Sequence, residues 1–227
     1  MKTTFLSGAL CGLLGLAISA SAAGARPISY EVTFRDAVVA TQTVSIVQSA
    51  GLTTVSCSFK ADLPVFVALH HYSEELSVSF REDGTVERLA SRIQNGPVQT
   101  VISGALQSNG GLQIIRTDMA GVSTSLVARQ DYDFHSLALY GTAPAKFLPA
   151  NSPARVLQIA EGRVAPVAIQ SISESETFER QNLASKHLVW TEGIHVSHSW
   201  HPERFSDLPR RYVRQTENGE FLFNLIR

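Results

Sequence analysis

The strict alternation of apolar and polar side chains from residue 72 to 81 constrains the fold of this chain more than any other feature. One face of this stretch carries the apolar side chains of Tyr72, Leu76, Val78 and Phe80. A period of two is typical of a β-strand with one buried face. Asp83-Gly84 follows and predicts a tight turn into a returning strand. Glu74 breaks the pattern, because its position places a carboxylate on the apolar face.

The same alternation recurs along most of the chain and predicts an all-β fold with little α-helix. Further strands are expected near residues 28–34, 38–46, 55–63, 85–93, 98–106, 112–117, 122–127, 167–169, 188–190, 194–200, 210–214 and 221–225. The stretch 85–93 keeps its alternation only if a β-bulge interrupts it. Turn sequences such as Asn95-Gly96-Pro97 separate the strands and favour an antiparallel meander over a βαβ fold. We therefore expect one curved antiparallel sheet, a β half-barrel of about ten strands.

Residues 133–160 differ from the rest of the chain. Asp133 is placed to cap a short helix over residues 134–140 that ends at Gly141. The following stretch is interrupted by prolines but stays apolar, with Phe147, Leu148, Val156, Leu157 and Ile159. A long apolar connection of this kind has to be covered. The sequence predicts that it forms a plug over the open side of the curved sheet.

The N-terminus has the pattern of a bacterial signal peptide. Lys2 precedes an apolar run over residues 5–18, and Ala20-Ser21-Ala22 offers a small-x-small cleavage site. The run is shorter than the ~20 residues of a membrane-spanning helix. We expect residues 1–22 to be removed, with cleavage as late as residue 25 as an alternative. Residues 23–227 then form a single periplasmic or secreted β-rich domain without a transmembrane segment.

Charge and cysteine content exclude several classes of protein. The chain has 19 basic and 20 acidic side chains, and loss of Lys2 leaves a formal net charge of −2. This balance gives no basis for binding nucleic acid or an anionic membrane surface. Cys57 alone remains after export and falls on an apolar strand face, where a small buried hydrophobe is expected. The sequence has no nucleophile elbow, zinc-protease pair, redox cysteine pair or phosphate-binding loop, and it predicts no cofactor.

Several short motifs together resemble a family of secreted bacterial proteins of unknown function. They are Tyr30-x-Val32, Tyr72 ahead of Phe80 and Asp83-Gly84, Leu208-Pro209-Arg210-Arg211-Tyr212, and Gly219-x-Phe221. More distantly, the chain is similar to periplasmic half-barrel carriers of lipoproteins and other lipids, in which a curved sheet wraps around apolar plugging segments. The resemblance implies this fold and an apolar cargo. It transfers no catalytic residue.

The histidines do not predict a metal site. His195, His198 and His201 are three residues apart, and on a strand His198 faces away from the other two. The expected arrangement is one inward histidine, His198, on the same face as Trp200, with two surface histidines. We therefore expect no bound metal.

The candidate ligand-binding residues are His70, Tyr72, Glu74, His198 and Trp200, all expected on the inner face of the sheet. Three interpretations of Glu74 stay open, because a buried carboxylate has to be paired, hydrogen-bonded or protonated. It forms an ion pair with an arginine or a histidine, it orients an apolar ligand in a pocket, or it acts as an acid or base with His70 or His198. The last interpretation requires Glu74 and His198 within hydrogen-bond reach.

Arg210 and Arg214 share a strand face with Tyr212. They are expected on the solvated face of an edge strand, with contact to an anionic headgroup as the alternative.

The leading hypothesis is a non-catalytic protein that binds or carries a lipid-like apolar molecule between sheet and plug. The alternatives are an envelope assembly module that acts through a sheet edge, and an enzyme that uses Glu74 with His70 or His198. The sequence identifies neither the ligand nor a partner protein.

Overall fold

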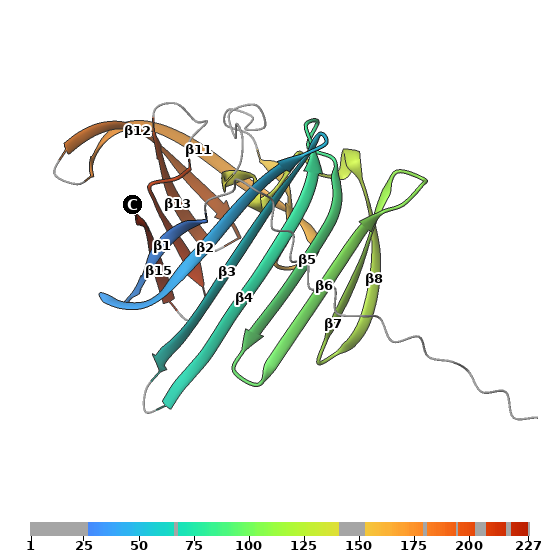
Figure 1. Ribbon diagram of the computed structural model, residues 1–227, viewed down its shortest axis with the longest axis horizontal. Helices are drawn as coiled ribbons and strands as arrows, with labels where there is room; N and C mark the ends of the chain where they lie inside the picture. Colours follow the sequence, from blue (N-terminus) through green and yellow to red (C-terminus); the bar gives the residue numbers. More distant parts are fainter. Residues whose placement is uncertain are drawn as a thin grey trace, which may run out of the picture.

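The computed structural model describes residues 27–65, 68–140, 153–178, 181–193, 195–202, 208–216 and 219–226. All strands belong to one curved sheet of 15 strands, in the order β8-β7-β6-β5-β4-β3-β2-β1-β15-β14-β13-β12-β11-β10-β9 (Figure 1). β8 and β9 are the two ends of this order, so the sheet curves without closing. The predicted all-β fold is confirmed, although the sheet has more strands than the ten expected.

The first and last strands meet at the centre of the sheet, and the chain forms one arm on each side of them. The first arm contains β1 (Ile28–Phe34), β2 (Ala37–Ser49), β3 (Leu52–Val65), β4 (Ala68–Arg81), β5 (Val86–Asn95), β6 (Val98–Leu106), β7 (Gly111–Asp118) and β8 (Gly121–Ala128). The second arm contains β9 (Phe134–His135), β10 (Ala154–Gln158), β11 (Arg163–Phe178), β12 (Gln181–Glu192), β13 (His195–Pro202), β14 (Arg211–Thr216) and β15 (Gly219–Ile226). Of two 3-10 helices, η1 (Arg129–Asp131) lies between the arms in sequence, and η2 (Ser136–Tyr140) lies between β9 and β10 of the second arm.

The predicted β-bulge lies between β4 and β5. Ser79 pairs with Arg88 but Phe80 pairs with Val86, which leaves Glu87 as the extra residue. Because of this shift, Val86 and Leu89 can both point into the core, and they are 0% and 3% exposed.

The core covers the concave face of the sheet. On β4, Glu74, Leu76, Val78 and Phe80 are all buried, as their parity predicted. The same layer continues across neighbouring strands through Val55, Cys57, Phe59, Tyr30, Val32, Phe34, Phe221 and Phe223. Cys57 is therefore the small buried side chain that the sequence predicted, and burial raises the pKa of its thiol, with a smaller contribution from the charge of Glu74.

The described parts of residues 133–160 pack into this core, as expected of a plug, but the expected helix is wrong. Phe134 and His135 form β9, which runs parallel to β10, and only η2 is helical. Asp133 does not cap η2. Its carboxylate accepts a hydrogen bond from the Arg155 backbone amide at 2.7 Å instead, so pairing with β10 replaces the first helical turn. Leu137, Tyr140, Leu157 and Ile159 join the core of the sheet. Residues 141–152, including Gly141, Phe147 and Leu148, lie outside the described residues.

The turn after β10 fastens the plug to the first arm. Gly162 has a positive φ of 65°, and a Cβ atom there would lie 2.8 Å from Ile102 and 3.0 Å from Ile114. These residues belong to β6 and β7, so the turn rests directly on the inner face of the sheet. In the described part of the chain, neither helical segment has the length and apolar content that a membrane-spanning helix needs.

Candidate functional site

A cavity of about 440 Å³ lies between the concave face of the sheet and the plug. Its apolar walls come from both arms and from η2, and include Leu76, Ile93, Leu137, Tyr140, Val156, Val167 and Trp190. Polar side chains reach it at Gln42, Glu74, Gln158, Glu161, Glu192, Arg214 and Gln215. The cavity thus combines apolar walls with a few polar groups, the usual composition of a small-molecule site.

The most buried charge in the cavity wall is Glu74, which forms a two-pronged ion pair with Arg214. The Arg214 Nη2 and Nη1 atoms donate to the Glu74 Oε2 and Oε1 atoms at 2.7 and 3.1 Å. The Tyr72 hydroxyl donates to Oε2 at 2.8 Å and accepts from Arg214 Nη2 at 3.2 Å. The Glu74 side chain is 5% exposed and that of Arg214 is 32% exposed. Arg214 therefore connects the buried carboxylate to the open part of the cavity.

The ionised form of Glu74 is the stable one. Burial pushes its pKa up, but the charge of Arg214 and the hydrogen bonds from Arg214 and Tyr72 together hold the pKa below its ordinary value. Burial raises the pKa of the Tyr72 hydroxyl, and the charge of Glu74 adds to that rise. Of the three interpretations left open by the sequence, the structure favours the Glu–Arg pair.

A layer of tyrosines closes the cavity beneath this pair. Tyr212 donates from its hydroxyl to the Gln42 Oε1 atom, and its ring stacks on Phe223 at 4.1 Å. The rings of Tyr30 and Tyr140 pack edge-on against Tyr212 at 5.5 and 5.8 Å. Because Tyr140 belongs to η2, this layer joins the plug to the two central strands.

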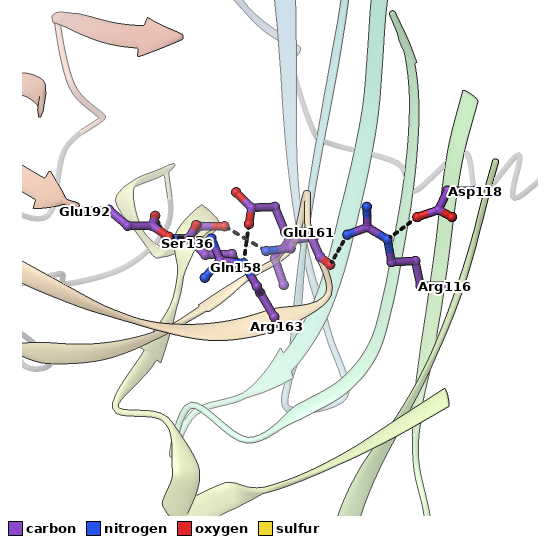
Figure 2. Close-up of polar contacts among 8 residues, drawn as sticks. Arg116, Asp118, Ser136, Gln158, Glu161, Arg163 and Glu192 are labelled. Carbon is purple, nitrogen blue, oxygen red and sulfur yellow. Dashed lines mark hydrogen bonds and ion pairs between the residues drawn. The ribbon is translucent and has the colours of Figure 1, made fainter. Parts of the chain in front are cut away.

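A polar network joins the plug to both arms at the rim of the cavity (Figure 2). Glu192 of β12 accepts hydrogen bonds from Gln158 at 2.9 Å and from Arg163 at 2.8 Å. Arg163 also pairs with Glu161, whose carbonyl accepts from Arg116 of β7 at 3.3 Å. Arg116 is held in turn by Asp118 at 2.7 Å. Since three of its ionised members are roughly half exposed, the network contributes more to positioning than to stability.

Two of the predicted site residues, His198 and Trp200, have side chains on the opposite face of the sheet from Glu74, so their predicted inward orientation is wrong, although His198 still borders the cavity. His198 lies beside Val213 in the register, and successive side chains alternate, so it faces away from Arg214. On the outer face the His198 and His187 rings stack on Trp200 at 5.8 and 4.5 Å, and the Arg211 guanidinium lies 4.8 Å from the Trp200 ring centre.

The inner face of β13 is formed by residues that the sequence analysis had placed outside. Ser199 is 1% exposed and His201 is 0% exposed. The Ser199 hydroxyl lies 3.0 Å from His201 Nε2 and 3.4 Å from Trp190 Nε1. An acid–base pair of Glu74 and His198 is therefore not formed.

The remaining predicted site residues divide between the cavity and its surroundings. Tyr72 and Glu74 line the cavity, whereas His70 interacts through Nε2 with the Asn95 side chain on β5. The described residues contain no group of three or more potential metal-ligating side chains.

Arg214 is the main residue of the cavity that the sequence analysis did not include among the candidate ligand-binding residues. β14 pairs with both β13 and β15, so it is an internal strand, and the expectation of an edge strand with solvated arginines is wrong. Two features of the sequence could have identified Arg214. It shares a strand face with Tyr212, and Glu74 on another strand needed a positively charged partner.

The fold is similar to that of a solved bacterial protein. It matches the crystal structure of a β-barrel-like protein of a domain of unknown function, DUF1849, from Brucella abortus, with a TM-score of 0.62. The alignment covers 89% of this chain and 96% of that chain, at 8% sequence identity. The similarity therefore establishes a common fold. No family model and no curated protein sequence matches the chain.

Proposed function

We propose that the protein binds a lipid-like, largely apolar molecule in the cavity between sheet and plug, as a periplasmic or secreted binding or carrier protein. The single observation that carries this proposal is the cavity itself, whose volume of about 440 Å³ falls within the roughly 300–1,000 Å³ of ligand pockets. Its aromatic and aliphatic walls suit an apolar body. The Arg214–Glu74–Tyr72 group supplies one polar end that fixes the orientation of a ligand.

Native mass spectrometry of detergent-free protein, followed by organic extraction, tests the proposal directly. We expect a co-purifying apolar compound. Trp190 lines the cavity and Trp200 lies on the outer face; the chain has only these two tryptophans. In a Trp200→Phe variant, Trp190 becomes the sole reporter, and its emission is expected to shift when an apolar probe such as N-phenyl-1-naphthylamine is added.

A cavity-filling variant supplies the matched control. Ala160 lines the cavity, whereas Ala90 is exposed on the outer face of β5. Ala160→Phe is expected to lower the amount of co-purified compound and the affinity for the probe, and Ala90→Phe is expected to leave both unchanged. Equal probe binding by the two variants, with no compound extracted from the wild type, would exclude the cavity as a binding site.

A second candidate function is assembly through the sheet edge. β8 ends the strand order, and its side chains Val122 and Leu126 are 70% and 60% exposed. An exposed edge strand without charged side chains invites pairing with another strand. Sedimentation velocity over a range of concentrations tests it, because Leu126→Lys should abolish any self-association. The cavity favours the binding function over this alternative.

A further inference from the structure

We infer that the ligand enters and leaves the cavity through the sheet itself, at a gap between β13 and β14, and that this route selects molecules with an unbranched acyl chain. The inference rests on the proposed binding function and deepens it. The β13–β14 gap is formed by residues 195–197 of β13 and 214–216 of β14.

The first observation is the short pairing of these two strands. β13 and β14 pair only at His198–Val213, Ser199–Tyr212 and Trp200–Arg211 in their described parts. Each strand nevertheless continues beyond this region with its other neighbour. β13 pairs with β12 as far as His195, and β14 pairs with β15 as far as Thr216. The two strands therefore separate while both remain extended.

The second observation is that a side chain of β14 replaces a backbone hydrogen bond between β13 and β14. In the register of the paired region, Val196 lies opposite Gln215. The Val196 amide donates to the Gln215 side-chain Oε1 atom at 3.3 Å. Paired strands lie about 4.8 Å apart, with backbone hydrogen bonds filling the space between them. Here the longer glutamine side chain takes the place of a backbone carbonyl, and from this we infer that the two strands lie farther apart.

The third observation is the pattern of residues that line the cavity. Every second residue of a strand faces a given side of the sheet, and β4 obeys this rule with Tyr72, Glu74 and Leu76. β12 obeys it with Trp190 and Glu192. β13 and β14 do not, because β13 contributes three consecutive residues, 197–199, and β14 contributes four, 212–215. A cavity reaches both faces of a strand only where it passes beside that strand through the sheet.

The single side chain that spans the gap indicates the class of ligand. A space bridged by one glutamine side chain admits an extended acyl chain, which is one methylene wide, once that side chain swings aside. A fused-ring amphiphile is too broad to pass unless the paired region above the gap also opens. On the inner side, the route leads directly to Arg214, which is available to an acyl headgroup at the mouth of the cavity.

The test locks the gap and measures exchange of dodecanoate, with cholate as the fused-ring comparison. The variant Val196→Cys with Gln215→Cys places two thiols directly opposite each other, and Cys57 is buried. Formation of the disulfide is checked by mass; if the separation exceeds the Cα distance of about 4.4–6.8 Å that a disulfide needs, a short bis-maleimide closes the gap instead. Stopped-flow emission of Trp190 in the Trp200→Phe background gives the association and dissociation rates.

Locking is expected to slow both dodecanoate rates by about tenfold or more relative to the reduced form of the same variant, and reduction of the disulfide is expected to restore them. Gln215→Ala removes the bridging side chain and should speed exchange. Cholate is expected not to exchange in any variant. The control pair Ala90→Cys with Ser103→Cys links β5 to β6 at opposed, exposed positions and should leave exchange unchanged.

Dodecanoate exchange at the wild-type rate in the locked protein would overturn the route while leaving the proposed function intact. Exchange of cholate as fast as dodecanoate would overturn the selection of acyl chains. If wild-type protein binds no apolar probe at all, the proposed function and this inference are both wrong.

Discussion

Replacement of Arg214 by methionine tests the buried ion pair, which is the central polar feature of the cavity. The variant leaves the carboxylate of Glu74, 5% exposed, with the Tyr72 hydroxyl as its remaining side-chain donor among the described residues. Removing one partner of a buried pair costs about 3–5 kcal/mol. Because the Arg214 side chain is 32% exposed, we expect the lower half of that range, about 3 kcal/mol at pH 7.

Protonation of Glu74 limits this cost and makes it depend on pH. Without Arg214, burial is no longer opposed by a positive charge, so the pKa of Glu74 rises above its ordinary value instead of lying below it. A raised pKa in the folded state means that folding takes up a proton, and stability is lost as pH rises. Protonating an ordinary glutamate costs about 4 kcal/mol at pH 7 but only about 1 kcal/mol at pH 5.

In the wild type, the contribution of Glu74 to stability depends on pH in the opposite direction. The pKa of Glu74 is held below its ordinary value, so its contribution to stability is present above the ordinary glutamate pKa and is lost as pH falls through the lowered value. The difference in unfolding free energy between wild type and Arg214→Met should therefore shrink from about 3 to about 1 kcal/mol between pH 7 and pH 5.

Urea unfolding at the two pH values measures this difference. Lys60→Met breaks an exposed ion pair with Glu75, at 3.9 Å, and should change stability by less than about 0.5 kcal/mol at either pH. The double variant Arg214→Met with Glu74→Gln should show no pH dependence beyond that of the rest of the protein. A destabilisation by Arg214→Met that is the same at pH 5 and pH 7 would refute the assignment of Glu74 as a buried, charge-paired carboxylate.

Three further predictions follow from single residues. Gly162→Ala should cost about 1–3 kcal/mol more in urea unfolding than Gly110→Ala, because both glycines have positive φ but only Gly162 contacts the sheet; equal costs would contradict the docking of the plug. Burial, with a smaller effect of the Arg129 charge, lowers the pKa of His135 to about 3, so the wild type should lose about 2 kcal/mol more stability than His135→Leu between pH 7 and pH 5. Intact mass of the protein exported from a bacterial host should place the mature N-terminus at Ala23, or as late as Arg26; a retained Lys2 would contradict the signal peptide.

The accuracy of the sequence analysis depended on which face of a strand meets the core. Along β4 the interior is a packed apolar layer, so alternation alone placed Val78 and Phe80 inside, where they are 0% and 6% exposed. On β13 the same rule placed Trp200 inside and Ser199 outside, and both assignments are wrong. The inner face of β13 meets the cavity with Ser197 and Ser199, and the stack of Trp200 with His187 and His198 shields the aromatic surface of Trp200 on the outer face. An aromatic side chain that is covered by neighbouring rings on the outer face produces no apolar–polar alternation that would reveal its orientation.

The sequence analysis predicted that Glu74 pairs with an arginine or a histidine, but it did not predict which one. The carboxylate had to be paired because of its parity, and an arginine was one of the two expected partners. Arg214 lies 140 residues away in the sequence and reaches Glu74 across the cavity from the other arm of the sheet. A contact of this kind depends on the curvature of the whole sheet, which no local pattern specifies.

The pairing of β1 with β15 at the centre of the sheet also determines when the protein can become functional. Each arm consists mainly of hairpins between neighbouring segments and can begin to form as soon as it is synthesised. In the described residues, the strand pairing that joins the two arms is between β1 and β15, which are far apart in the sequence. Because contacts of such large sequence separation form slowly, complete assembly of the sheet has to wait for β15. A chain that stops short of residue 219 would lose this strand pairing between the arms, and Tyr30 and Phe34 would lie on a new, aggregation-prone edge strand.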